Sequence, residues 1–354
     1  MSITGSRKEQ IAVLTGGGDA PGLNAVIRGI VVRAKSLGYD VLGFRLGWKG
    51  LLGDGHEHPL DLDYVEDIHM IGGTILGSSR TNPIKIPNGI EKIKETLKKN
   101  NCQYLIAIGG DDTLGVANQL FKEGIKVVGV PKTIDNDLSG TDYTFGFDTA
   151  VNRAADAIHN LHTTAKSHQR VLLVEVMGRY AGWITLHAGI AGGAHIILIP
   201  EVPFDIEEIC KIIMRREKLG REYTMIAVSE GALPKDGTGF VVQNSEKDAF
   251  DHVRLGGIAE ILAREIEKRT GKEARHVVLG HLQRAGSPTA FDRVLGTRLG
   301  VKAVQLVHEK KFGQMASLQG TEIVDVLLEE GVGKLKTVPL SRYDEARIFF
   351  GIDS

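Results

Sequence analysis

The chain has 354 residues, of which 42% are hydrophobic and 25% charged, and its formal net charge is -1. This length exceeds what a single hydrophobic core usually serves, so two domains are expected. A nearly neutral chain has no electrostatic attraction for nucleic acid or for an anionic membrane, which excludes both as expected partners. The only cysteines, Cys102 and Cys210, are too few for a disulfide framework or a cysteine metal site.

The first residues of the chain are polar, so a signal peptide is not expected there. No apolar run approaches the ~18 residues that are needed to span a bilayer. Because two isolated cysteines also fit a reducing compartment, we expect a soluble cytoplasmic protein.

Short β-rich apolar runs alternate with amphipathic stretches along the chain. The predicted strands cover residues 11–15, 104–108, 127–130, 171–176, 195–199, 224–228 and 276–279. The predicted helices cover residues 23–36, 89–99, 114–122, 149–163, 207–219, 258–268 and 294–308. This alternation is typical of βαβ crossovers, which build mostly parallel sheets with helices on both faces. Ligands of such sheets bind beyond the carboxyl ends of the strands.

Two glycine-rich segments follow early in the chain. Residues 15–22 (TGGGDAPG) link the first strand to a helix, where backbone N–H groups favour an anion, although a tight turn explains this pattern equally well. The segment lacks the lysine of a Walker loop. Residues 72–80 (GGTILGSSR) end in Arg80, which could bind phosphate oxygens or simply be solvated.

The most informative segments are residues 109–113 (GGDDT) and 131–137 (PKTIDND), each of which follows a predicted strand. Together they supply one lysine and four aspartates, a set that suits metal-assisted phosphoryl transfer. Asp111 is a natural Mg²⁺ ligand. Lys132 can neutralise donor phosphates, and a carboxylate in this second segment can accept a proton from an attacking hydroxyl. A less specific reading is that Asp112 and Thr113 only cap the next helix.

Further charged residues surround the later strands. Arg179 follows the strand at residues 171–176, and a delocalised cation there suits a transferring phosphoryl group. Glu230 follows the strand at residues 224–228 and could accept hydrogen bonds from sugar hydroxyls. Arg275, His281 and Arg284 lie on the last predicted strand and its exit loop, and would suit a sugar phosphate. Taken alone, His281 is better explained as a core histidine.

These motif blocks resemble those of the phosphofructokinase A family and occur in family order from residue 11 to about residue 300. The resemblance implies two Rossmann-like three-layer α/β/α domains with mostly parallel sheets. Residues 1–146 with about 283–332 would form the domain for the phosphoryl donor and Mg²⁺. Residues 147–282 with about 333–354 would bind fructose 6-phosphate, the phosphoryl acceptor.

The resemblance also implies a role for each matching residue. Asp135 would be the proton acceptor, with Thr133, Arg179 and Asp137 as further catalytic residues, and Asp111 would bind Mg²⁺. Gly17, Arg80 and Lys132 would bind the donor. The acceptor site would comprise Thr133, Asp135, Arg170, Met177, Gly178, Arg179, Glu230, Arg275, His281 and Arg284. Arg170 would reach the active site of an adjacent subunit, so a homodimer or homotetramer with shared active sites is expected.

Asp112 and Lys132 stand at the two positions that set the donor in this family. Family members that use pyrophosphate as the donor have an aspartate and a lysine at these positions, whereas members that use ATP have two glycines. A carboxylate at Asp112 would exclude a nucleotide by its bulk and its charge. The sequence therefore predicts a pyrophosphate-dependent member of the family, in its mixed-substrate group. It would reversibly convert fructose 6-phosphate and pyrophosphate into fructose 1,6-bisphosphate and phosphate, in glycolysis or gluconeogenesis.

Two alternatives stay open at this point. An ATP-dependent phosphofructokinase could tolerate Asp112 and Lys132, and a non-catalytic sensor of sugar phosphates could use the same fold. A sensor has no use for the base Asp135, which disfavours it. Regulation by phosphate effectors is expected to be weak or absent, because Val32 and Ile71 stand where the family resemblance leads us to expect arginines, although Arg28 is present.

Overall fold

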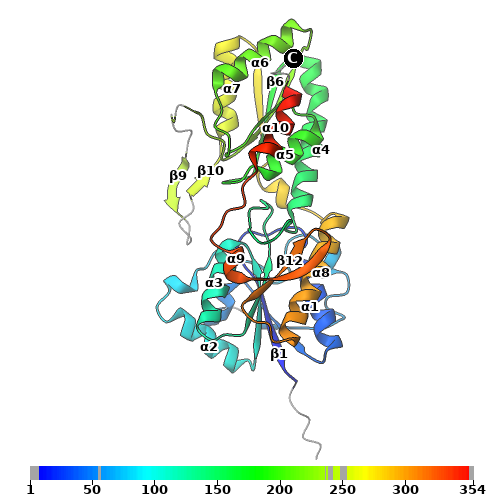
Figure 1. Cartoon of the computed structure of the whole chain (residues 1–354), viewed down its shortest axis with the longest axis vertical. Coiled ribbons are helices and arrows are strands. Elements are labelled where there is room, and N and C mark those ends of the chain that lie inside the picture. The colour runs from blue at the N-terminus through cyan, green and yellow to red at the C-terminus, as the bar shows by residue number, and fades with distance from the viewer. Residues whose placement is uncertain (1–7, 55–56, 236, 238–241, 248–252, 351–354) are drawn as a thin grey trace, which may run out of the picture. The chain divides into compact units, whose positions relative to one another are not determined.

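The computed structural model describes residues 8–54, 57–235, 237, 242–247 and 253–350. The chain divides into two compact units, each of which is an α/β structure (Figure 1). Unit 1 comprises Met1–Ile134, Leu138–Gly146 and Arg284–Lys334, and unit 2 comprises Asp135–Asp137, Phe147–Gln283 and Leu335–Ser354. The short segment Asp135–Asp137 therefore groups with unit 2, whereas the sequence-based division had placed it in the first domain.

Unit 1 contains a seven-stranded sheet in the order β13-β12-β5-β4-β1-β2-β3. Its strands are β1 (Gln10–Thr15), β2 (Asp40–Phe44), β3 (Glu57–Leu60), β4 (Tyr104–Gly109), β5 (Val127–Pro131), β12 (Gln314–Gln319) and β13 (Glu322–Leu327). All neighbours are parallel except the pairs β2–β3 and β12–β13. From β1 the chain continues to β2 on one side, and later returns to β4 on the other side. The carboxyl ends of β1 and β4 therefore form a topological switch point, where ligands of open α/β sheets bind.

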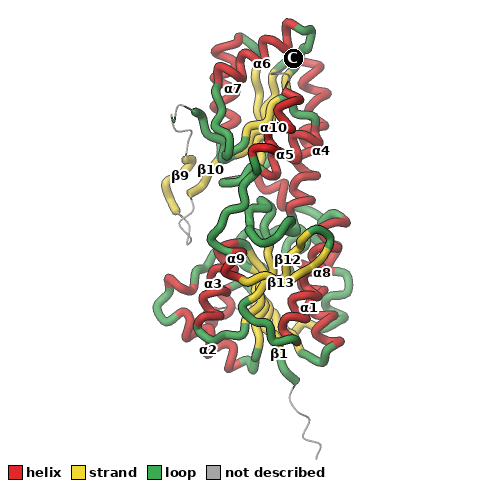
Figure 2. Tube along the Cα trace, viewed as in Figure 1, coloured by secondary structure: helices red, strands yellow, loops and turns green. Residues whose placement is uncertain are grey.

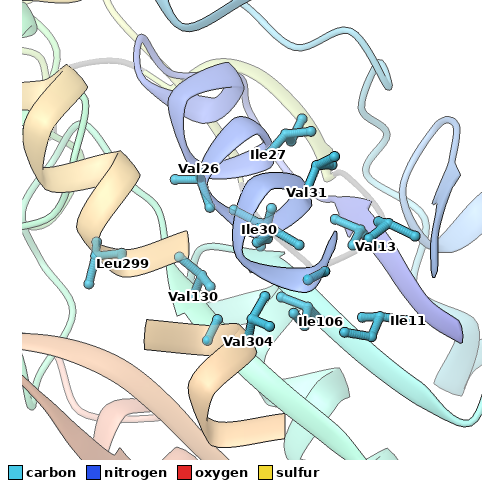
Figure 3. Close-up of a cluster of buried hydrophobic side chains, with 14 of the residues drawn as sticks. Ile11, Val13, Val26, Ile27, Ile30, Val31, Ile106, Val130, Leu299 and Val304 are labelled. Carbon is cyan, nitrogen blue, oxygen red and sulfur yellow. The ribbon is translucent and has the colours of Figure 1, made fainter. Parts of the chain in front are cut away.

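Helices cover both faces of this sheet. They are α1 (Leu23–Ser36), α2 (Gly89–Lys99), α3 (Asp111–Lys122), α8 (Ala290–His308) and the short α9 (Leu328–Gly331). Figure 2 shows α1 and α8 on one side of the strands and α2 and α3 on the other. Most residues of α1 are buried, because the helix packs on the sheet on one side and against α8 on another. In Figure 3, Ile30 lies over Ile106 of the sheet, whereas Val26 points toward α8. Each such side chain contributes about 1.5–3 kcal/mol on burial.

Unit 2 contains a four-stranded parallel sheet in the order β11-β6-β8-β7. Its strands are β6 (Val171–Val176), β7 (Ile196–Leu198), β8 (Thr224–Ser229) and β11 (Ala274–Val278), and a separate antiparallel pair joins β9 (Val242–Lys247) to β10 (Val253–Leu255). The helices are α4 (Phe147–His168), α5 (Trp183–Gly192), α6 (Ile206–Lys218), α7 (Ile258–Thr270) and α10 (Leu340–Arg347). In Figure 2, α6 and α7 lie on one side of the strands and α4 and α5 on the other.

The predicted fold class, two α/β/α units with mostly parallel sheets, is confirmed. Every predicted strand and helix is present. The bounds of α1, α2 and β6 are those predicted, and the ends of the other elements are shifted. The sequence analysis missed β2, β3, β12 and β13, which lie at the two margins of the large sheet. Of these, β3 and β13 expose more side chains than the central strands, whereas β2 and β12 are mostly buried. It also missed α5, because this helix is apolar on all sides and shows no amphipathic period.

Glu175, the one acidic residue within β6, is 2% exposed and has a structural role. Its carboxylate accepts hydrogen bonds from Gly257 N at 3.0 Å and Ala259 N at 3.0 Å. These are N–H groups at the start of α7 that have no partner within the helix. The carboxylate therefore replaces a helix cap, and the partial positive charge of the helix end stabilises it.

Within the described residues, no helix combines the length and the apolar character that a bilayer crossing requires.

Candidate active site

The loops after β1, β4 and β5 begin at the same carboxyl edge of the large sheet, because the ends of these three strands are paired with one another. Thr15 is paired with Ile108, and Gly109 with Pro131. Beyond these pairs, Gly16 N donates to Ile108 O at 2.9 Å and Lys132 N donates to Gly109 O at 2.9 Å. The structure thus brings together the three motifs that the sequence analysis assigned to the phosphoryl donor.

Gly17 links the first glycine-rich loop to the second. Its N–H donates to Ser79 O at 3.1 Å, and its carbonyl accepts a short hydrogen bond from the Ser78 hydroxyl. The φ angle of Gly17 is 78°, in the left-handed region that glycine adopts without strain. Arg80 follows Ser79 directly and is exposed. The two loops therefore form one bonded surface with an arginine at its end.

Lys132 is only 4% exposed, and its ammonium lies against the first glycine-rich loop. Nζ donates to Gly18 O at 2.6 Å and is 3.4 Å from the point that a Cβ on Gly17 would occupy. A buried ammonium requires hydrogen-bond partners, which the loop carbonyl supplies. A lysine after a proline is usually a solvated surface side chain, and the burial of Lys132 excludes that reading here. A fixed cation beside a half-buried glycine-rich loop is suited to phosphate.

Asp111 and Asp112 form the first turn of α3, whose N-cap is Gly110. Neither aspartate nor Thr113 is the N-cap residue that the less specific reading required. Asp111 is exposed, and its Oδ1 accepts a hydrogen bond from Gly333 N at 2.8 Å. In the part of the chain that the structure describes, no group of three or more His, Cys, Asp or Glu side chains could hold a metal ion. A lone carboxylate suits Mg²⁺, which retains waters and binds substrate phosphates.

Arg284 belongs to unit 1 and contacts the first glycine-rich loop. Its Nη1 donates to Asp19 O at 2.8 Å and lies 3.0 Å from the point that a Cβ on Gly18 would occupy. The sequence analysis grouped Arg284 with His281 and Arg275. The structure assigns those two residues to unit 2, so the contacts of Arg284 within its own unit are to the donor loops.

In unit 2, the loops after β6 and β8 are bonded to each other. Glu230 N donates to Val176 O at 2.9 Å, Gly178 N donates to Glu230 Oε1 at 3.5 Å, and Ser229 Oγ donates to Gly178 O at 2.6 Å. A Cβ on Gly231 would lie 2.0 Å from Arg179 O, so only glycine permits this close approach. The structure thus places Gly178, Arg179 and Glu230 in one cluster at the carboxyl edge of the sheet.

Gln283 connects this cluster to the turn that carries His281. It is fully buried, its Oε1 accepts a hydrogen bond from Met177 N at 3.3 Å, and its Nε2 donates to Gly280 O at 3.2 Å. His281 itself is exposed, which excludes the alternative of a core histidine. The sequence analysis assigned no role to Gln283. Its place within the run HLQR was the only signal available.

Arg170 and Arg275 lie at the opposite end of the same sheet. Arg170 precedes β6, and Arg275 lies near the start of β11, where Ala274 pairs with Val171. Both arginines contact Glu273, at 3.3 Å and 2.6 Å respectively. The six residues of β6 separate them from Met177 by roughly 20 Å of strand. Within one chain, Arg275 therefore does not join His281, contrary to the grouping that the sequence suggested.

Glu230 has an unusual ionisation. Burial, and secondarily the negative charge of Asp135, raises its pKa from 4.5 to about 7. Both effects disfavour the charged carboxylate, whereas the N–H of Gly178 and the charge of Arg179 oppose them. Near neutral pH the group is therefore divided between its protonated and its ionised form.

Replacement of Glu230 by glutamine tests this ionisation through stability. The stability contributed by the protonated carboxyl is fully present below the unfolded pKa of 4.5 and is lost as the pH rises through the folded value of about 7. Relative to the wild type, Glu230→Gln should therefore gain about 3 kcal/mol of unfolding free energy between these two pH values. Urea titrations of both proteins at a series of pH values measure this gain in unfolding free energy. Glu222→Gln, at an exposed position, should show no such gain, and a pH-independent difference for Glu230→Gln would contradict the assignment.

The segment 131–137 passes from unit 1 to unit 2 between Ile134 and Asp135. Thr133 is held by a hydrogen bond from the Thr144 hydroxyl to its carbonyl at 2.7 Å. Lys132 and Asp135 are three positions apart, so the chain itself keeps their Cα atoms within about 10 Å. The motif therefore joins the donor loops of unit 1 to the cluster of unit 2 covalently.

Glycine-rich loops at a switch point, with a buried lysine and an aspartate at a helix N-terminus, are typical of α/β proteins that bind phosphate groups. The phosphofructokinase family profile matches residues 10–307, and the chain belongs to this family. A relative from Amycolatopsis methanolica, named pyrophosphate--fructose 6-phosphate 1-phosphotransferase, is 58% identical over 97% of this chain and 100% of its own length. A relative from Corynebacterium efficiens, named ATP-dependent 6-phosphofructokinase, is 52% identical over 97% of this chain and 99% of its own length.

Among solved structures, Pichia pastoris phosphofructokinase in the T-state matches 99% of this chain with a TM-score of 0.82 and 30% identity. This chain spans 37% of the length of the yeast chain. The likeness supports the fold described above, while the names of the bacterial relatives differ in the phosphoryl donor.

Proposed function

We propose that the chain catalyses the reversible transfer of a phosphoryl group from pyrophosphate to O1 of D-fructose 6-phosphate. The products are fructose 1,6-bisphosphate and orthophosphate, as in glycolysis and, in reverse, in gluconeogenesis. The observation that carries the proposal is the buried Lys132 ammonium on the first glycine-rich loop, three positions from Asp135. A lysine at this position, where family members that use ATP have glycine, favours pyrophosphate as the donor.

Donor binding is assigned to unit 1. The loop of Gly17 and the Lys132 ammonium bind the pyrophosphate oxygens, with Arg80 at the end of the second loop. Asp112 adds a side chain and a negative charge where family members that use ATP have glycine, and so disfavours a nucleotide. The names of the relatives are consistent with this: those at 56–58% identity carry pyrophosphate in their names.

The reaction requires a divalent metal ion, for which we propose Mg²⁺ with Asp111 as its protein ligand. The Gly333 N–H on Oδ1 orients that carboxylate. When bound, the ion would neutralise charge on the transferring phosphoryl group.

The acceptor and the chemistry are assigned to residues of unit 2 together with Thr133 and Arg284. Asp135 accepts the proton of the O1 hydroxyl as O1 attacks phosphorus, the bridging P–O bond breaks, and orthophosphate leaves. Arg179 stabilises charge on the equatorial oxygens, while Thr133 and Asp137 orient the reacting groups. Met177, Gly178 and Glu230 bind the sugar, and His281 and Arg284 bind its 6-phosphate.

A homo-oligomer, dimer or tetramer, completes the site in this proposal. Arg170 and Arg275 lie at the amino end of their sheet and share Glu273, so we assign both to the sugar phosphate site of an adjacent subunit. Val32 and Ile71 are exposed apolar residues, which supports weak or absent regulation by phosphate effectors. Cytoplasmic localisation also belongs to the proposal, and two cysteines without a disulfide are consistent with it.

A donor assay tests the function directly. Purified protein with fructose 6-phosphate and Mg²⁺ should turn over pyrophosphate at least about tenfold faster than ATP at matched concentrations, a preference of about 1.4 kcal/mol in transition-state stabilisation. Preference for ATP would favour the ATP-dependent alternative. Binding of fructose 6-phosphate without turnover of either donor would favour the sensor.

A further inference from the structure

Residues 335–338, which precede α10 (Figure 1), are bonded to the segment that contains Asp135. Lys336 N donates to Asp137 O at 2.8 Å, and Lys336 Nζ donates to Asn136 Oδ1 at 3.0 Å. The backbone and the side chain of one residue thus contact two successive residues of the segment, across 200 positions of sequence.

Lys336 is in turn held by the start of α5. Nε1 of Trp183, the first residue of α5, donates to Lys336 O at 2.8 Å. Lys336 Nζ lies 5.8 Å from the centroid of the Trp183 ring, a distance at which a cation is attracted to an aromatic face. Val338 N donates to Glu201 Oε1 at 2.8 Å, and the same oxygen accepts from Gly182 N at 3.0 Å. The lysine is therefore fixed by a helix terminus.

The residue that Lys336 contacts has a restricted backbone. Asn136 is 3% exposed, and its φ angle is 52°, in the left-handed region. Asparagine tolerates this region better than most residues, but such a conformation persists only where its surroundings determine it. Asp135 directly precedes Asn136, so the direction of its carboxylate depends on this turn.

We propose that Lys336 is a positioning residue for phosphoryl transfer, which holds Asn136 and Asp137 and thereby sets the direction of the Asp135 carboxylate. This rests on the proposed function, in which Asp135 accepts the proton. Three residues earlier, Gly333 N donates to Asp111, so the same stretch of chain also orients the carboxylate assigned to the metal.

Kinetics of Lys336→Met and Lys336→Arg test the proposal. Lys336→Met keeps the backbone bonds and the apolar stem but removes the donor to Asn136. A small misplacement of a reacting group should lower kcat by about 10- to 100-fold. KM for both substrates should stay within about threefold, because the groups that bind them are unchanged. Arginine can donate to the same oxygen and stack on Trp183, so Lys336→Arg should restore most of kcat. Lys334→Met, at an exposed position of the same segment, should match the wild type.

A second measurement does not require activity. Amide hydrogen exchange in residues 133–138 should rise about tenfold or more in Lys336→Met, and should rise also in Trp183→Phe, which loses the indole donor. A kcat of Lys336→Met within about threefold of the wild type, or a loss that Lys336→Arg does not restore, would overturn the proposal. Unchanged exchange would overturn it as well. If the wild type turns over neither donor, the proposed function fails, while the exchange difference still decides whether Lys336 orders this turn.

Discussion

Replacement of Asp135 by serine is expected to lower kcat by about 100- to 10,000-fold, the usual contribution of a positioned general base. Serine keeps a small polar side chain but cannot accept the proton of the attacking hydroxyl at neutral pH. Binding of fructose 6-phosphate should weaken by less than about tenfold, because other residues bind the sugar and its phosphate. Steady-state kinetics with pyrophosphate and calorimetric titration of fructose 6-phosphate measure the two effects separately.

Asp156→Ser, the same substitution at an exposed position of α4, is the matched control and should leave kcat unchanged. Equal losses of turnover and of binding in Asp135→Ser would show that Asp135 binds the sugar without acting as the base. Such a result would also remove the main argument against a non-catalytic sensor.

The second large effect is expected from the double variant Asp112→Gly, Lys132→Gly. It should use ATP better than the wild type does, because a carboxylate beside the phosphates is removed, and it should lose pyrophosphate activity because the buried cation is lost. We expect the ratio of kcat/KM for pyrophosphate to that for ATP to fall by about 100-fold or more, since two charged groups change. Assays with each donor measure the ratio.

Exposed residues next to the same helix, α3, and the same strand, β5, provide the control for the donor ratio. Glu123→Gly with Lys126→Gly removes one acid and one lysine at the other ends of α3 and β5, and should leave the donor ratio unchanged. The single variants separate the two contributions: Asp112→Gly should act mainly on ATP, and Lys132→Gly mainly on pyrophosphate. Unchanged pyrophosphate kinetics in both would show that neither residue selects the donor.

Part of the candidate site could be predicted because its signals are local in the sequence. A strand that ends in glycines and is followed by a helix indicates a phosphate-binding turn, so the loops of Gly17 and Asp111 were found without any contact information. The charged segment of Lys132 was found because it directly follows a predicted strand. The family resemblance added roles for these residues. No local signal identified Lys336, because it is meaningful only through Asn136, which is 200 positions away.

The sequence by itself determined the alternation of strands and helices and the α/β fold class, because periodicity and turn residues act over a few positions. The family was indicated separately, by the resemblance of the motif blocks to those of known members. Only the tertiary structure decided which loops share a sheet edge. It grouped Asp135 with unit 2, placed Arg275 and His281 at opposite ends of one sheet, and buried Lys132 against Gly18. These outcomes depend on strand order and on contacts between distant segments, and a pattern of neighbouring residues does not encode them.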